Sequence, residues 1–455
     1  MSARGNFGSR FTAIMAMAGS AIGLGNIWRF PYMAGKYGGA AFIIIYLLSA
    51  VFICVPIFMS ESIIGKRTQL GTFGAMAKLA PGSKWKWMGL FTVVTPLIIL
   101  SYYSVVGGWS LEYLLKSLSL SFVGGSVSRE THSAVFGAFI SSTWQPLIAH
   151  TIFIIINGII VFAGVKKGIE KFSKITTPVL FVLIVIIMFY SLSLPGAMDG
   201  VSYLVKPNFS KLTSEGILSA MGQAFFSLSL GVGTILTYAS YMRKGDNILS
   251  TGLYTAGFDL LFAMIAGFAI MPAVFAAGIE PGAGPGLIFE TLPYIFSTMG
   301  QTSPVLSSVV SILFFVTILF AALTSSISML EVGVSYLVDE KKWTRAHATV
   351  LICVVCWGVG VFCSLSFGPL SGVSLLGNSI FDFCDKLASN FLMVMGSLLF
   401  VIFVGWKMDA AAVKDEMLIG NSSRLGAWCV PPMRFLIRYV APIAIILIFI
   451  SNLVL

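Results

Sequence analysis

The sequence predicts an all-α protein that crosses a membrane about eleven times. Of its 455 residues, 57% are hydrophobic and only 10% are charged, and the mean hydropathy is +0.94. Soluble globular domains carry about 25% charged residues, so the composition excludes that class. Apolar runs of about 20 residues, the length that spans a bilayer, are centred near Ala18, Leu48, Ile98, Ile154, Ile184, Leu228, Ile265, Phe315, Val355, Val394 and Ile445.

The basic residues follow a pattern that defines membrane topology. Most of the lysines and arginines lie in the N-terminal segment and in the loops after spans two, four, six, eight and ten. By the positive-inside rule, these loops face the cytoplasm. We therefore expect a plasma-membrane protein with its N-terminus inside and its C-terminus outside. The net charge of +10 is then topological, and it indicates the lipid bilayer as a partner and no nucleic acid.

The cysteines and histidines indicate no metal or redox centre. Cys353 and Cys356 have the spacing of a CxxC motif, but they lie in an apolar helix, where small packing residues are expected. The three histidines are scattered along the chain. The sequence contains neither a nucleophile motif nor a selectivity-filter signature, which argues against an intramembrane enzyme and against an ion channel.

Two spans are interrupted by small and polar residues at mid-membrane depth. The first interruption runs from Gly19 to Asn26 in span one, and the second from Ser227 to Thr234 in span six. Glycine weakens a helix, and asparagine carries polar groups that hydrocarbon cannot satisfy. Unwound backbone is tolerated there only inside protein or beside a cavity. Paired breaks in two halves of a chain indicate the binding site of a transporter.

The distance between the two breaks predicts an internal repeat. Spans one and six are five spans apart, and a repeat with an odd number of spans must enter the membrane inverted. The predicted halves are residues 1–194 and 213–406, followed by an extra transmembrane helix at 432–455. A short amphipathic segment from Leu287 to Thr298 is expected to fold over the outer mouth as a lid.

Three separated motifs resemble the neurotransmitter:sodium symporter family. They are Ala16 to Pro31 in span one, Gly222 to Gly231 in span six and Leu323 to Ser326 in span eight. The likeness covers nearly the whole chain and is greatest to short bacterial amino-acid transporters with eleven spans. The resemblance implies sodium-coupled symport by alternating access, in a fold of two inverted five-helix repeats with broken helices in spans one and six.

The resemblance implies two Na⁺ sites made of oxygen ligands, which a hard cation prefers. The first site would use the substrate carboxylate and Ala21, Asn26, Ser227 and Asp259. The second would use the carbonyls of Gly19, Ile22 and Ala321 and the hydroxyls of Thr324 and Ser325. Taken alone, these two hydroxyls favour hydrogen bonds within their own helix. The paired breaks favour the ion site.

Asp259 departs from the pattern of the family, which usually has asparagine at this place. The alignment of span seven leaves an offset of one residue open. A carboxylate at membrane depth marks a functional site by default. Its fixed negative charge would replace the anion that chloride-dependent relatives need, so transport without chloride is expected. A purely structural aspartate is the alternative.

The predicted substrate is a hydrophobic L-amino acid, aliphatic or aromatic. Amides at Leu24 and Gly25 would face its carboxylate, and Tyr103 would donate its hydroxyl. Monoamine carriers of the family place aspartate where Gly23 stands, so the ligand should bring its own carboxylate. The side-chain pocket would be apolar, with room left by Ser229, and lined by Ile22, Ile99, Tyr103, Phe226, Val232, Ser326 and Met329. General bundle packing is the alternative role for several of these residues.

The resemblance also implies gates. Arg29 and Asp385 would form the outer gate, and Arg4 and Asp339 the inner one. Exposed ion pairs contribute only about 0–1 kcal/mol each, which suits a gate that must open repeatedly. Glu61, near the inner end of span two, is expected to be held by backbone amides of the broken span one. Two rival functions stay open: a proton-coupled carrier of the same architecture, and a sensor that binds amino acids without transport.

Overall fold

The computed structural model describes residues 5–123, 128–278, 286–420 and 424–454. These residues form helices and no strand, apart from isolated β-bridges that join Gly39 to Pro207 and Leu375 to Asn378. The predicted fold class, an all-α membrane protein, is therefore confirmed.

Nine helices in the described parts of the chain are long and apolar enough to cross a membrane. Several of these spans consist of two α-helical segments that are connected by a π-helical turn. The nine are α3 (Ala40–Ser49) with α4 (Val55–Thr68), α6 (Trp85–Leu118), α8 (Trp144–Phe162), α9 (Lys171–Leu192), α13 (Ile248–Ala276), α15 (Pro304–Lys341), α16 (Arg345–Leu365), α17 (Ile380–Lys386) with α18 (Met393–Ile402), and α20 (Arg424–Phe435) with α21 (Ala441–Val454).

The two remaining predicted spans are the broken ones. Span one consists of α1 (Arg10–Ala21) and α2 (Phe30–Lys36), with a bend of 58° between the two arms. Span six is divided into α11 (Ser214–Ser227) and α12 (Thr234–Ala239). Outside the spans, the described residues also form the short α-helices α5 (Thr72–Leu79), α7 (Arg129–Ser141), α10 (Ala197–Val205), α14 (Leu292–Thr302) and α19 (Ala410–Leu418).

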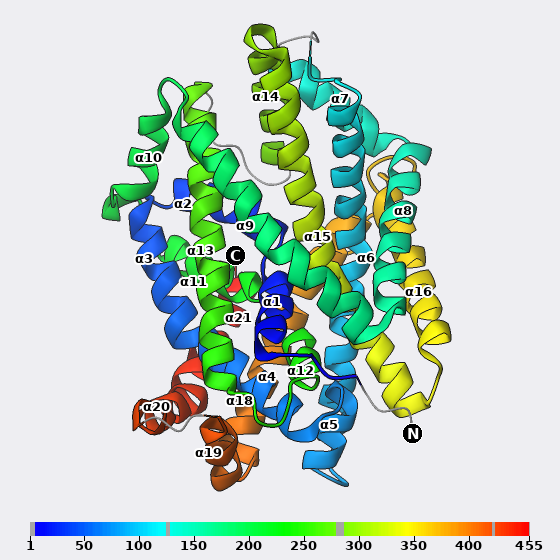
Figure 1. Ribbon diagram of the computed structural model, residues 1–455, viewed down its shortest axis with the longest axis vertical. Helices are drawn as coiled ribbons and strands as arrows, with labels where there is room; N and C mark the ends of the chain where they lie inside the picture. Colours follow the sequence, from blue (N-terminus) through cyan, green and yellow to red (C-terminus); the bar gives the residue numbers. More distant parts are fainter. Residues whose placement is uncertain (1–4, 124–127, 279–285, 421–423, 455) are drawn as a thin grey trace.

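Helix α1 occupies the centre of the bundle (Figure 1). It contacts α9, α12, α13 and α15, and every residue from Thr12 to Ala21 is buried. Small side chains such as Ala16, Ala18 and Gly19 allow this close approach of helices. Helices α6 and α15 pack along each other, and α8 and α16 cover them at one edge of the bundle. The first break therefore lies deep inside protein.

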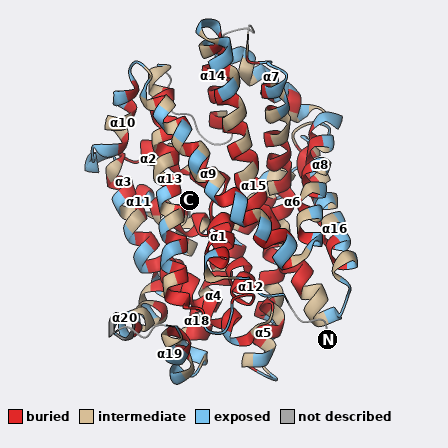
Figure 2. Cartoon of the chain, in the orientation of Figure 1, coloured by how far each residue is buried: buried red, intermediate tan, exposed pale blue. Residues whose placement is uncertain are grey.

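The perimeter of the bundle is apolar. Figure 2 shows buried residues concentrated in the middle and exposed residues at the edge. Many exposed side chains there are large and hydrophobic, including Ile159 of α8 and Phe189 of α9, each 65% exposed. A soluble protein rarely exposes so much contiguous apolar surface. This perimeter is therefore suited to contact lipid.

The segment predicted as a lid is helical. A π-helical turn at Leu287–Thr291 continues into α14, at the same end of the molecule as α7. Phe289 is fully buried, with ring centroids 5.4 Å from Phe136 of α7 and 5.9 Å from Trp109 of α6. The segment is thus anchored to the end of α6, and its action as a lid stays a prediction.

Candidate binding site between the broken helices

The break in span one frees backbone groups at the centre of the bundle. Helix α1 ends at Ala21, and Ile22 is extended, with φ −66° and ψ 106°. A π-helical turn, Gly25–Arg29, then leads into α2. The Asn26 side chain stabilises the break, because its Oδ1 accepts the Gly23 amide at 3.1 Å.

The break in span six contains residues in the left-handed backbone conformation. Residues 228–233 separate α11 from α12, and φ is +51° at Ser229, +79° at Gly231 and +72° at Gly233. A β-carbon on Gly231 would lie only 2.1 Å from the Met393 carbonyl oxygen of α18. Only glycine fits a position with this φ and this close contact.

Glu61 of α4 holds the second break. Its carboxyl oxygens accept the Gly231 amide at 2.7 Å and the Leu236 amide at 3.4 Å. The predicted partners, amides of span one, are therefore wrong. The physical reason is that α4 packs against α12, which brings the buried carboxyl group to the start of that helix.

Replacing Glu61 with glutamine is expected to lower the free energy of unfolding by about 2 kcal/mol, because a buried donor without an acceptor costs about 1–3 kcal/mol. Glutamine offers one acceptor oxygen and turns an NH₂ group toward the other backbone amide. Thermal unfolding of the detergent-solubilised protein measures the change. The control is Glu130→Gln on the surface of α7, and equal stability of the two variants would contradict this capping role.

A polar cluster joins span one, span six and span seven. The Asn26 amide nitrogen donates to Asp259 Oδ1 at 2.7 Å and to Ser227 Oγ at 3.0 Å. Ser227 Oγ in turn donates to Asp259 Oδ2 at 2.8 Å. All three side chains are buried. The structure thus places Asp259 itself, and not a neighbour in sequence, beside Asn26.

A second polar cluster joins α1 to α15. Ser325 Oγ donates to the carbonyls of Ser20 and Ile22, each at 3.2 Å. Thr324 Oγ1 donates to the Ala321 carbonyl at 3.1 Å within α15. A β-carbon on Gly19 would lie 3.4 Å from Thr324 Cβ, so this glycine lies against the same turn. The residues of the predicted second ion site are therefore neighbours.

A narrow cavity of about 40 Å³ opens between the two breaks. That is well below the roughly 300–1,000 Å³ typical of small-molecule sites, so the walls must move apart to admit a ligand. The hydroxyl of Tyr103 from α6 points to the first break and accepts the Leu24 amide at 3.4 Å. The wall consists of Ala21, Gly23, Leu24, Gly25, Asn26, Ile99, Tyr103, Phe226, Ser227, Ser229, Val232, Ser325, Met329 and Met393.

Two residues expected on this wall lie elsewhere. Ser326 donates to Asn157 Oδ1 of α8 at 2.5 Å, so its side chain faces the neighbouring helix. Ile22 is fully buried beside the wall and offers its carbonyl to Ser325. Neither residue lines this cavity, and their contact with a substrate stays a prediction. Met393 of α18 takes a place on the wall that no motif in the sequence indicated.

A family model described as the sodium:neurotransmitter symporter family matches residues 4–134 and 138–455. The chain belongs to this family. The sodium-dependent transporter YhdH of Bacillus subtilis is 40% identical over 445 residues, which cover 97% of this chain and 96% of the relative. A sodium-dependent transporter of Haemophilus influenzae is 33% identical over 99% of this chain and 98% of its own length.

A solved structure has the same fold. The crystal structure of MhsT in complex with L-phenylalanine matches with a TM-score of 0.89 and 39% identity, covering 99% of this chain and 100% of MhsT. Together these findings identify a sodium-dependent, multi-pass membrane transporter. Members of this symporter family are secondary transporters and not enzymes.

The structure describes three of the four residues predicted as gates: Arg29, Asp385 and Asp339. The Arg29 guanidinium carbon lies 5.2 Å from the Phe226 ring centroid, and Asp385 of α17 is near enough to attract it electrostatically. The ion pairs found among the described residues do not include these two. Arg4 lies outside the described residues. Its predicted partner Asp339 accepts the Gly71 amide at 3.3 Å.

Proposed function

We propose that this symporter couples Na⁺ to the uptake of hydrophobic L-amino acids, aliphatic or aromatic, and that it does not require chloride. The supporting observation is an apolar cavity that meets freed backbone amides at the break of span one. The likeness to MhsT, whose structure contains L-phenylalanine, supports the same substrate class.

The substrate carboxylate would bind at the first break. Helix N-termini offer amides and the positive end of a dipole to an anion. Leu24 and Gly25 supply such amides, and Tyr103 supplies a hydroxyl next to them. Gly23 brings no carboxylate, and a β-carbon there would lie 2.9 Å from Ser325 Oγ. A bare amine would therefore meet no anion at this position.

The first Na⁺ would bind between this carboxylate and the cluster of Asn26, Ser227 and Asp259, with the Ala21 carbonyl. Because the substrate and the ion share a ligand, each increases the affinity of the site for the other. The Asp259 carboxylate supplies a fixed negative charge beside the ion, in the role that chloride has in chloride-dependent transporters. The second Na⁺ would bind to the carbonyls and hydroxyls at Gly19, Ile22, Ala321, Thr324 and Ser325.

Uptake by proteoliposomes tests this function. The purified protein is reconstituted, and a panel of radiolabelled amino acids is offered with external Na⁺ and Cl⁻ varied independently. Accumulation of leucine- and phenylalanine-like substrates should require Na⁺ and should be unchanged when gluconate replaces chloride. Uptake driven by a proton gradient without Na⁺ would contradict the coupling, and binding without accumulation would indicate a sensor.

Removing the hydroxyls of the second ion site should weaken Na⁺ binding. We expect Thr324→Ala/Ser325→Ala to raise the Na⁺ concentration for half-maximal uptake about 10-fold or more, since losing contacts with a charged group costs about 1.5–3 kcal/mol. The matched control is Thr317→Ala/Ser335→Ala on the same helix. Those hydroxyls are buried and donate to the Leu313 and Val332 carbonyls within α15. The same shift in both double variants would exclude a site at Thr324 and Ser325.

A further inference from the structure

A second pocket lies between the end of span ten and the start of span eleven. Its volume is about 530 Å³, compared with about 40 Å³ for the central cavity. Its wall comes from two π-helical turns, Phe403–Lys407 and Leu436–Val440, together with α19 and α20.

Every charged residue on this wall is a cation: Lys414, Arg434 and Arg438. The ion pairs of the described residues include none of the three. The nearby carboxylate of Glu416 is engaged elsewhere, because it is buried and pairs with Lys66 of α4 at 2.6 Å. The pocket therefore attracts an anion.

Arg438 is held in place for such a ligand. Its guanidinium carbon lies 4.4 Å from the Trp406 ring centroid, and the Trp406 indole nitrogen donates to the Arg438 carbonyl at 3.2 Å. The Arg438 Nε is buried and has no hydrogen-bond partner among the described residues. Buried donors nearly always have an acceptor. A planar guanidinium matches phosphate oxygens through paired hydrogen bonds.

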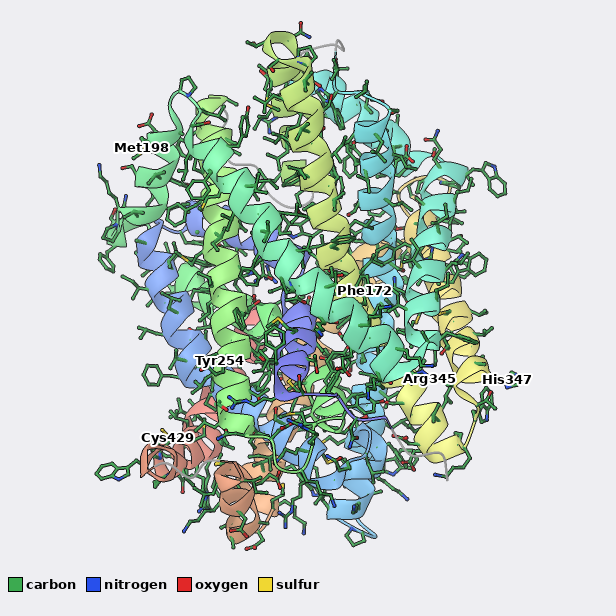
Figure 3. The ribbon with its side chains drawn as sticks, in the orientation of Figure 1. Phe172, Met198, Tyr254, Arg345, His347 and Cys429 are labelled. Carbon is green, nitrogen blue, oxygen red and sulfur yellow. The ribbon has the colours of Figure 1, made fainter. Side chains whose placement is uncertain are left out.

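The surroundings of the pocket are those of a membrane surface. Three aromatic side chains at or near its rim are exposed: Trp406, Phe435 and Tyr439. Aromatic residues are enriched where a protein passes from lipid to water. Figure 3 shows Cys429 of α20 near one end of the molecule and Met198 of α10 toward the other end. The pocket thus lies at the boundary of the membrane-spanning region and not at its middle.

An apolar face continues from the pocket along the next helix. Ile443, Leu447 and Ile450 of α21 follow Tyr439 at intervals of three or four residues, and each is at least half exposed, at 60%, 52% and 51%. This spacing places them on one face of a helix. A molecule with a phosphate in the pocket can therefore extend acyl chains along α21. A soluble phosphate has no acyl chains and would make no contact with this apolar face.

We propose that this pocket binds the head group of an anionic phospholipid in the leaflet that faces the cytoplasm. Basic pockets between membrane helices on that side recognise such head groups through their phosphates. The three cations supply the charge, the Trp406 ring fixes Arg438, and the exposed face of α21 accommodates the acyl chains. The proposal does not depend on which amino acid the symporter carries.

Native mass spectrometry of the purified, full-length protein tests this site. Dioleoylphosphatidylglycerol and dioleoylphosphatidylcholine are titrated separately, and the bound lipid is counted. The anionic lipid should bind the wild type more tightly. Because a basic residue near an anionic surface contributes roughly five-fold in affinity, Arg434→Gln/Arg438→Gln should weaken phosphatidylglycerol binding about 25-fold and leave phosphatidylcholine unchanged. Lys84→Gln/Lys86→Gln removes the same charge from the start of α6 and should change neither.

A second variant separates local geometry from net charge. Trp406→Leu keeps all three cations but removes the ring that holds Arg438, so it should also weaken phosphatidylglycerol binding selectively. Size-exclusion chromatography verifies that each variant is folded and monodisperse. The proposal would be overturned if the wild type bound the two lipids with equal affinity. It would also be overturned if Lys84→Gln/Lys86→Gln lost as much affinity for phosphatidylglycerol as Arg434→Gln/Arg438→Gln. Displacement of the lipid by millimolar glycerol 1-phosphate would overturn it in favour of a soluble phosphate ester.

Discussion

Replacing Asp259 with asparagine is expected to lower amino-acid uptake about 100-fold or more in chloride-free buffer, and added chloride should restore part of it. The carboxylate lies 2.7 Å from the Asn26 amide nitrogen and 2.8 Å from Ser227 Oγ, in a fully buried cluster. Two opposite charges 4 Å apart attract each other by about 4 kcal/mol at an effective dielectric constant near 20. Asparagine keeps the size and one acceptor oxygen, but its NH₂ group replaces the other oxygen and the attraction for Na⁺ is lost.

The measurement is initial uptake by proteoliposomes at several Na⁺ concentrations, with chloride or gluconate as the anion. The loss should appear mainly as a higher Na⁺ requirement, because the substrate amides at Leu24 and Gly25 are unchanged. Asp199→Asn, on the exposed surface of α10, is the control for the loss of one carboxylate. If Asp259→Asn retained the Na⁺ requirement of the wild type, Asp259 would be a structural residue and the account of chloride independence would fail.

Much of the fold and the position of the two breaks followed from local chemistry. Glycines and an asparagine inside an apolar run identify a break in any membrane helix, because hydrocarbon cannot satisfy free backbone groups. The two breaks were therefore placed correctly. The grouping of Asn26, Ser227 and Asp259 was implied only by the resemblance to the family, and the structure brings the three side chains together. A buried carboxylate needs partners, and these breaks are where partners occur.

The features that the sequence did not predict depend on the rotation and the packing of the helices. Ser325 and Ser326 are adjacent, but neighbours in a helix point about 100° apart, so one faces the cavity and the other faces Asn157 of α8. The partners of Glu61 depend on which broken helix α4 contacts, and no local pattern encodes that choice. Met393 lies in a uniformly apolar span, where nothing in the sequence distinguishes a wall residue from a packing residue.

Replacing Tyr103 with phenylalanine is expected to raise the KM for every transported amino acid about 10- to 100-fold, since a hydrogen bond to a charged group contributes about 1.5–3 kcal/mol. The Tyr103 hydroxyl lies 3.4 Å from the Leu24 amide, at the place proposed for the substrate carboxylate. Phenylalanine preserves the ring that lines the cavity, so the apolar contacts remain. Initial uptake rates at varied substrate concentration measure the change.

A carboxylate-free analogue makes this prediction specific. Phenethylamine has the aromatic side chain and the amine of phenylalanine, so its competition with substrate measures every contact except those of the carboxylate. Tyr103→Phe should weaken inhibition by phenylalanine and leave the weak inhibition by phenethylamine unchanged. Tyr113→Phe is the control on the same helix, because its ring lies in an aromatic cluster with Phe136 and Phe289, away from the cavity wall. Equal losses for both ligands would mean that Tyr103 shapes the cavity and does not bind the carboxylate.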